Sequence, residues 1–378
     1  MTSSDFIVIG GGIAGASVAW HLAHDNRVVV LERESQPGYH TTGRSAALFA
    51  ESYGTAQVRA LTLASREFFE HPPAGFTGHP ILSDRGALFV AGPGQQPQLD
   101  ALYAEIGAQG DAIHRVSADE IMARVPVMRA AWVTGGIADP LAADMDVHAL
   151  HQGFLRGLRA LGGTLRCDAE VTAIARHGGA WRVTIAGGDT FEAPVVINAA
   201  GAWCDAIAAL AGVAPIGLVP KRRTAFTFPA PAGFDVRAWP TVIGVDESFY
   251  FKPDAGQMLG SPANADPVPP QDVQPEVEDV ATGIDRIECA THLSIRRPSR
   301  TWAGLRSFVA DGDLVGGFDP DAPGFFWCAA QGGYGIQTCP AMSEACASLA
   351  QDRGLPARLA AFGLTAAMLS PARLRGVA

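Results

Sequence analysis

The chain carries little charge and contains no long hydrophobic run. Only 17% of its 378 residues are Asp, Glu, Lys or Arg, and the formal net charge is -10. A negative chain without a dense Lys/Arg run does not attract a phosphate backbone, so we expect no nucleic-acid partner. Every apolar run is interrupted by Gly, Asp or Arg well before about 18 residues, so we expect no transmembrane segment, while peripheral membrane contact stays open.

The sequence also lacks the patterns of a secreted or metal-binding protein. Its six cysteines form no CxxC pair and no His cluster has zinc spacing, so we expect free thiols and no metal. The amino-terminal stretch MTSSD has no basic region before an apolar run, so we see no sign of a signal peptide and expect a cytoplasmic protein. The content of 48% apolar residues is that of an ordinary globular chain, and the length favours two domains.

Residues 6–31 have the pattern of a βαβ unit. Phe6–Ile9 is a short apolar run typical of a buried parallel strand, and Val28–Leu31 is a second one. Between them, Ile13–Leu22 has apolar residues at helical spacing. A unit of this kind predicts a parallel sheet covered by helices.

The first strand and the helix are joined by GGGIAG, which contains the GxGxxG pattern at Gly10, Gly12 and Gly15. In a dinucleotide-binding turn these glycines allow a tight turn, backbone approach to a pyrophosphate and close helix packing, in that order. Glu32 follows the second strand, where a carboxylate binds the adenosine ribose and disfavours the 2′-phosphate of NADP. These residues predict FAD or NAD and leave the choice between them open.

Further elements are predicted later in the chain. Asp144 or Asp146 can cap an amphipathic helix that ends at residues 162–163. The stretch PVVINAAGAW contains a fully apolar strand, which suits the middle of a sheet. From about 220 to 275, prolines and alternating segments indicate antiparallel strands of a second domain.

Four stretches, GRSAALFA, NAAGAWCD, AGLRSF and QGGYGIQT, are part of a likeness that covers almost the whole chain. Through them the chain resembles the flavoprotein family of D-amino-acid oxidases and dehydrogenases, which also holds glycine and sarcosine oxidases. Within that family it is most similar to the bacterial FAD-dependent D-arginine dehydrogenases. The resemblance implies FAD rather than NAD. We expect FAD to be non-covalent, because the segment around Arg306 has no cysteine.

The resemblance also implies the fold, an α/β plus α+β architecture. A Rossmann-like FAD-binding domain is expected beside a discontinuous second domain built on an antiparallel sheet. The expected limits are 1–84, 144–218 and 318–378 for the FAD-binding domain, and 85–143 and 219–317 for the substrate domain.

The same resemblance implies which residues contact FAD. They lie in the glycine turn, at and after the second strand, and in the glycine-rich stretch near the carboxyl end. The set is Gly10, Gly12, Ala14, Gly15, Glu32, Arg33, Gly43, Arg44, Ser45, Ala46, Ala47, Val171, Ala200, Gly201, Gly332, Gly333, Tyr334, Gly335, Ile336, Gln337 and Thr338. In QGGYGIQT we expect Thr338 to cap a helix with Pro340 in its first turn, whose dipole faces the flavin pyrimidine.

For catalysis, the resemblance implies two arginines and two tyrosines. Arg306 and Arg223 correspond to carboxylate-binding arginines, and a guanidinium fork is the natural partner of a carboxylate. Tyr53 and Tyr250 match active-site tyrosines that orient the substrate.

The substrate pocket implied by the resemblance comprises Leu48, Ala50, Ala87 and Gln337. The arginine-specific relatives have His, Thr and Glu at the first three of these positions, so three polar side chains are missing here. An arginine side chain would lose its charge partner, at a cost on the order of a few kcal/mol. We therefore expect a preference for neutral, apolar D-amino acids over D-arginine.

The implied reaction is oxidative deamination of a free D-amino acid, in which a hydride leaves Cα and water converts the imino acid to a 2-oxo acid and ammonia. We find no second GxGxxG for NADPH, so quinone or dioxygen is the expected electron acceptor. Three alternatives stay open: a secondary-amine oxidase for sarcosine-, glycine- or proline-like substrates, a 2-hydroxyacid oxidoreductase, and a non-catalytic NAD-binding redox sensor.

Overall fold

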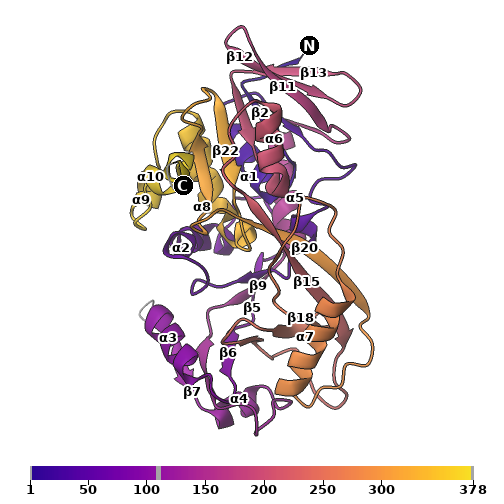
Figure 1. The fold of residues 1–378 in the computed structure, drawn as a ribbon. Helices are drawn as coiled ribbons and strands as arrows, with labels where there is room; N and C mark the ends of the chain where they lie inside the picture. The colour runs from indigo at the N-terminus through magenta and orange to yellow at the C-terminus, as the bar shows by residue number, and fades with distance from the viewer. Residues whose placement is uncertain (1, 108–111, 376–378) are drawn as a thin grey trace.

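Two large sheets organise the fold, one in each half of the molecule as drawn in Figure 1. The computed structural model describes residues 2–107 and 112–375. Both chain ends lie in the upper half. The chain therefore leaves the upper half and returns to it, which makes the upper half discontinuous in sequence.

The sheet of the upper half has six strands, and its strands are parallel except for the last. The βαβ prediction is confirmed, since its strands are neighbours and α1 (Ile13–Leu22) joins them. The apolar strand predicted for the middle of a sheet also lies there, between two parallel neighbours. In spatial order the strands are β10 (Thr164–Arg166), β3 (Val28–Leu31), β2 (Phe6–Ile9), β14 (Val195–Asn198), β22 (Phe325–Ala329) and β21 (Val315–Phe318).

Both faces of this sheet are covered, because successive side chains of a strand point to opposite faces. Val8 and Val30 pack with the helices of one core cluster, whereas Ile7 and Val29 pack with a second cluster on the other face. The first face is covered by α1, α2 (Ala56–Glu70) and α8 (Gly335–Ala350). The second is covered by α6 (Cys204–Leu210) and a small sheet of β1 (Thr2–Ser3), β13 (Thr190–Ala193), β12 (Ala180–Ile185) and β11 (Val171–His177).

The predicted amphipathic helix is α5 (Val147–Ala160), and Asp146 is its N-cap. The Asp146 Oδ1 atom accepts a hydrogen bond from Ala149 N at 2.7 Å. Asp144, the other candidate, instead pairs with Lys252 Nζ at 2.7 Å and Arg85 Nε at 2.7 Å.

The predicted cap of the last long helix is wrong. The helix α8 begins at Gly335, so Thr338 lies inside its first turn, where its hydroxyl donates to Tyr334 O at 2.9 Å. Pro340 consequently stands within the helix rather than in its first turn. The glycine-rich turn lets the chain enter the helix early, since Gly332 adopts a φ of +54°.

The sheet of the lower half has nine strands, and all its strand pairs are antiparallel except β16 with β6. This confirms the antiparallel character predicted for residues 220–275. The helices α4 (Ala118–Arg124) and α7 (Val277–Ala290) share a core with one face, and α3 (Gln96–Ile106) packs on the other. The strands are β19 (Asp266–Pro267), β15 (Val219–Pro229), β18 (Gln257–Ser261), β17 (Tyr250–Asp254), β16 (Thr241–Gly244), β6 (Ala87–Ala91), β8 (Gly135–Asp139) and β7 (His114–Val116), with β20 (Arg300–Phe308) paired to β15.

The remaining elements are short. A three-stranded sheet consists of β4 (Leu48–Phe49), β9 (Ala143–Met145) and β5 (Leu82–Asp84). The 3-10 turns η1 (Thr41–Arg44), η3 (Gly201–Trp203) and η4 (Pro371–Leu374) and the helices α9 (Ala357–Ala360) and α10 (Ala366–Leu369) lie in loops. In the described part of the chain, no helix is both long and apolar enough to cross a bilayer. The residue limits expected for the two domains remain our proposal.

Candidate functional site

A cavity of about 330 Å³ extends from the upper sheet to the lower one. One end is lined by residues that follow parallel strands: Gly10 after β2, Glu32 after β3 and Ala199 after β14. The other end is lined by Arg223 on β15, together with a tyrosine of β17 and an arginine of β20. The carboxyl edge of an open parallel sheet is where such folds bind nucleotides.

Two glycines of the turn after β2 are required by close approach. Gly10 has a φ of +105°, and a Cβ atom there would lie 2.5 Å from Ala199 O. A Cβ atom on Gly15 would lie 1.8 Å from Gly10 O, so this glycine lets α1 pack against the turn. The spacing of the glycine pattern therefore follows from the packing of strand, turn and helix.

The amino end of α1 points its N–H groups at the cavity, since Gly12 and Ala14 line it. Gly12 is the N-cap and has no side chain to satisfy them. Instead, the Thr42 hydroxyl accepts a hydrogen bond from Ile13 N at 3.0 Å. The helix end is thus completed by a residue of η1, and its positive dipole end suits a phosphate. Thr42 was not among the predicted site residues.

His151 is a second residue that the sequence did not reveal. It is buried on α5, and its Nε2 atom lies 2.8 Å from Gly11 O. A carbonyl oxygen only accepts, so Nε2 carries the hydrogen. Burial lowers the pKa of His151, so it disfavours the charged form of the ring. The available signal was a polar residue between Leu150 and Phe154 on the apolar face of the helix.

At the other end of the cavity, the pairing of β15 with β20 brings the two predicted arginines together. Arg223 stands opposite Gly304, and Arg306 lies two residues further along the partner strand, so both side chains share one face. The Arg306 guanidinium lies against Gly333, where a Cβ atom would be 2.8 Å from Cζ. Arg306 Nη1 also donates to Tyr53 Oη at 3.4 Å.

Two guanidinium groups lie close together at this end, with the Glu247 carboxylate near enough to act on Arg223. Burial lowers the pKa of Arg223, and the positive charge of Arg306 lowers it further. Burial acts on Arg306 in the same direction, but the hydroxyls of Tyr53 and Tyr250 outweigh it and hold its pKa above the usual value. Both arginines stay protonated at neutral pH. The Arg223 Nε atom is buried without a hydrogen-bond partner among the described residues.

The residues predicted for the substrate pocket lie beside Tyr53 rather than in the lining of the cavity. Leu48, Ala50, Ala87 and Tyr53 belong to one apolar cluster of the lower half. Gln337 is buried, accepts from Ala50 N at 3.3 Å and donates to Thr62 Oγ1 at 2.9 Å. Gln337 therefore holds the segment before Tyr53 onto α8.

The family model described as FAD dependent oxidoreductase (DAO) matches residues 5–349. The chain belongs to this family. Its cofactor is therefore FAD, which decides the choice that the glycine turn alone left open. The alternative of an NAD-binding redox sensor is therefore wrong, because it named NAD as the cofactor.

Solved structures share the whole fold of this oxidoreductase. The glycine oxidase of Geobacillus kaustophilus has a TM-score of 0.83 at 22% identity, over 97% of this chain and 99% of that one. The FAD-bound L-alpha-glycerophosphate oxidase of Mycoplasma pneumoniae has a TM-score of 0.84 at 17% identity, over 93% and 95% of the two chains. These likenesses confirm the predicted fold class.

A curated relative, the L-2-hydroxyglutarate dehydrogenase of Salmonella houtenae, is 28% identical over 222 residues, which are 56% of this chain and 50% of that protein. The chain thus spans about half the length of the L-2-hydroxyglutarate dehydrogenases that it matches. None of the proteins named above is a D-arginine dehydrogenase, so the resemblance to that enzyme stays a prediction.

The residues at the nucleotide end of the oxidoreductase fit FAD. Glu32 is only 8% exposed, and its carboxylate accepts from Gly11 N at 2.7 Å and from Glu34 N at 2.9 Å. Each oxygen keeps a lone pair for a ribose hydroxyl. The helix end completed by Thr42 suits the pyrophosphate.

Most residues predicted to contact FAD line the cavity. Those that line it are Gly10, Gly12, Ala14, Glu32, Arg33, Arg44, Ser45, Ala46, Val171, Ala200, Gly201, Gly332, Gly333, Gly335 and Ile336. Those outside the lining are Gly15, Gly43, Ala47, Tyr334, Gln337 and Thr338.

Arg44 is directed toward the lower half of the oxidoreductase. Its Nη1 atom donates to Val273 O at 2.9 Å and Ala303 O at 3.1 Å, and its Nη2 atom pairs with Asp272. This side chain therefore fastens η1 to β20.

Proposed function

We propose that the protein oxidises the α-carbon of free D-amino acids, giving an imino acid that water converts to a 2-oxo acid and ammonia. The observation that carries this proposal is the pair Arg223 and Arg306 at one end of the FAD cavity, with Arg223 Nε lacking a partner among the described residues. A substrate carboxylate supplies the missing acceptors. FAD, when bound, supplies the hydride acceptor.

The side chains at this end bind and orient the substrate. Arg223 and Arg306 share the face of the β15–β20 pair and hold the carboxylate between them. Tyr53, in contact with Arg306, and Tyr250, in the cavity lining, restrict how the substrate turns. No separate base is required, because an amine that is neutral at the working pH has no proton to lose before the hydride leaves.

The proposal extends to a preference for neutral, apolar side chains. The cluster beside Tyr53 contains Leu48, Ala50 and Ala87, and the Asp139 carboxylate next to it already accepts from Ser52 Oγ at 2.6 Å and from Leu141 N at 3.1 Å. A cationic side chain there would be desolvated beside a carboxylate that is already hydrogen-bonded, so D-arginine should be disfavoured by about tenfold or more in kcat/KM against D-leucine.

A 2-hydroxyacid oxidoreductase is a second candidate, because a curated relative oxidises 2-hydroxyglutarate by name. A 2-hydroxy acid would place its carboxylate on the same arginines, but its hydroxyl proton needs a base. Among the described residues that line the cavity, the only imidazole is that of His40, which lies 2.8 Å from Glu34 and packs against Trp203 with the two rings tilted by 49°. This arrangement favours the amine. An oxidase for sarcosine-, glycine- or proline-like substrates is the alternative within amine oxidation.

Anaerobic mixing of the yellow protein with single substrates tests the proposal. D-Leucine should bleach the flavin absorbance, whereas D-arginine, L-leucine and 2-hydroxyglutarate should bleach it much more slowly. Faster bleaching by N-methylglycine or by 2-hydroxyglutarate would establish the corresponding alternative. Admitting air afterwards shows the acceptor: a rapid return of colour indicates dioxygen, and a slow return indicates a quinone.

A cytoplasmic location stays our prediction.

A further inference from the structure

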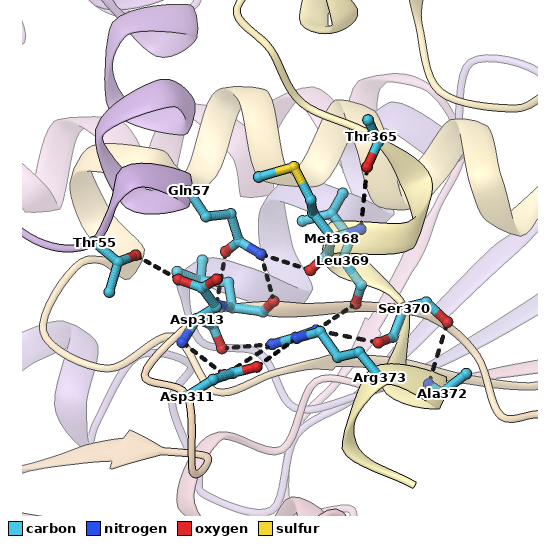
Figure 2. A network of polar contacts seen from close by, with 11 residues as sticks. Thr55, Gln57, Asp311, Asp313, Thr365, Met368, Leu369, Ser370, Ala372 and Arg373 are labelled. Carbon is cyan, nitrogen blue, oxygen red and sulfur yellow. Dashed lines mark hydrogen bonds and ion pairs between the residues drawn. The ribbon is translucent and has the colours of Figure 1, made fainter. Parts of the chain in front are cut away.

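A polar network joins three segments of the chain that are far apart in sequence (Figure 2). The first, residues 55–57, follows Tyr53 directly. The second, residues 311–314, follows β20, which carries Arg306. The third, residues 365–373, lies near the carboxyl end. The network therefore joins the segment after Tyr53 to the segment after Arg306. It does so from outside the cavity, since no residue of the network lines the cavity.

Thr55 is the first link. Its hydroxyl donates to Asp313 Oδ1 and accepts from Val58 N at 3.3 Å, so it caps α2 and binds the turn after β20 at once. That turn abuts Thr55 closely: Gly312 has a φ of +78°, and a Cβ atom there would lie 3.7 Å from Thr55 Cγ2. The start of α2 is thus held against the end of the β20 segment.

Gln57 is the second link, and both the oxygen and the nitrogen of its buried side-chain amide form hydrogen bonds. Its Oε1 atom accepts from Leu314 N at 2.8 Å, and its Nε2 atom donates to Leu314 O at 3.2 Å and to Met368 O at 2.8 Å. An amide bound in both directions has one orientation. Gln57 therefore fixes α2 to the 311–314 segment and to the carboxyl-terminal segment.

Arg373 is the third link. Its guanidinium donates to Asp311 Oδ2 at 2.8 Å and Asp313 O at 3.0 Å, and also to Leu369 O at 3.0 Å. Burial raises the pKa of Asp311, but the hydrogen bond from Arg373 and the other bonds to its carboxylate outweigh burial and leave the pKa lowered. The ion pair is charged at neutral pH and holds the turn in which Asp313 reaches Thr55.

The segment before Tyr53 is held by different partners. Ser52 Oγ donates to Asp139 Oδ2 at 2.6 Å, and Gln337 binds Ala50. Tyr53 thus lies between an anchor to the lower half and α8 on one side and the network on the other. The network reaches the chain just beyond β20, whereas the turn before α8 binds β20 itself through Gly332 N and Ser307 O at 3.0 Å.

We propose that Thr55, Gln57 and Asp313 are positioning residues that set the separation of Tyr53 from Arg306, with Arg373 holding the Asp313 turn. This inference rests on the proposed function, because it gives Arg306 the task of binding the substrate carboxylate. If the network is broken, Tyr53 moves relative to Arg306, and the substrate carboxylate then binds less tightly between them. The network therefore raises the affinity for substrate without contacting it.

Benzoate binding, followed by the change in flavin absorbance, tests the proposal directly. Thr55→Val and Asp313→Ala should each raise the Kd for benzoate and the KM for D-leucine by about tenfold, with a smaller change in kcat. Thr55→Ser keeps the hydroxyl and should restore both values to near those of the wild type. Asp313→Ala leaves the helix cap intact, so it separates the network from the stability of α2.

Arg375→Ala is the matched control. Arg375 lies two residues beyond Arg373, but it binds Ala214 O, Pro215 O and Asp319. It should lower the melting temperature and leave the Kd and the KM unchanged, whereas Arg373→Gln should raise both. Unchanged benzoate affinity in Thr55→Val and Asp313→Ala, or an equal loss in Arg375→Ala, overturns the positioning role while the proposed function stands. A wild-type flavin that responds to neither benzoate nor any amino acid overturns both.

Discussion

Replacing Arg223 by Met should stabilise the protein and weaken substrate binding at the same time. The Arg223 Nε atom is buried without a partner among the described residues, and Arg306 places a second positive charge nearby. Burial and this charge lower the pKa of Arg223, so folding disfavours its charged form. A buried N–H group without a partner costs about 1–3 kcal/mol. Met fills similar space without the charge, so the free energy of unfolding should rise by about that amount.

Substrate binding should change in the opposite sense. A hydrogen bond to a charged group contributes about 1.5–3 kcal/mol. Loss of Arg223 should therefore raise the KM for D-leucine and the Kd for benzoate by about ten- to a hundredfold.

The adjacent Arg222 provides the control, because it faces the other side of β15. It is ion-paired with Asp266, Glu276 and Asp279, the last at 2.8 Å. Arg222→Met leaves these carboxylates without their cation, so it should lower stability while the KM stays unchanged. Chemical denaturation of FAD-saturated, substrate-free protein measures the first effect, and steady-state kinetics the second. If Arg223→Met destabilises as Arg222→Met does, or binds benzoate normally, Arg223 is not an unpaired substrate ligand.

Two histidines lead to predictions with other readouts. His151→Phe removes the donor to Gly11 O and should raise the Kd of the apoprotein for FAD by about tenfold or more, as measured by flavin fluorescence. His151→Gln should lose less affinity, because it keeps an N–H group. Equal affinities of the two variants and the wild type would show that the glycine turn does not need this hydrogen bond. Burial lowers the pKa of His21 to about 3 from its usual 6.5. Between about pH 3 and pH 6.5, His21 is therefore protonated in the unfolded chain but not in the folded one. The free energy of unfolding consequently falls as the pH drops below 6.5. His21→Leu should flatten this decline in urea unfolding between pH 7 and pH 4.5, and an unchanged slope would contradict it.

Local patterns were sufficient for the elements on either side of the glycine turn. The strands at 6–9 and 28–31 have the predicted bounds, because each is a buried apolar run ended by glycine or a polar residue. The helix at 13–22 follows its apolar spacing after the glycine turn. The start of α8 was misplaced, since capping preferences of Thr338 compete with a glycine turn that already admits helical geometry.

Contacts between distant segments were beyond the reach of local patterns. Thr42 completes a helix end 29 residues before it, and His151 anchors a carbonyl 140 residues away. In the stretch KRRTAF, strand alternation separates Arg222 from Arg223, but only the pairing with β20 decides which of them faces the cavity. Sequence resemblance selected Arg223; residue type alone could not have done so.

The pairing of β20 also explains how the two halves form a single site. Within residues 2–107 and 112–375, one of its edges is paired with a strand, β15, and an open edge leaves backbone carbonyls without partners. Three alternate carbonyls on that edge are bound by segments of the upper half: Ala303 O by Arg44, Leu305 O by Thr41 and Ser307 O by Gly332 N. These segments also line the cofactor cavity. Because Arg306 lies between the last two carbonyls, the bonds that close the edge also hold the β20 backbone around Arg306 against η1 and the turn at Gly332. The lower sheet therefore cannot shift independently of these two segments of the cavity lining.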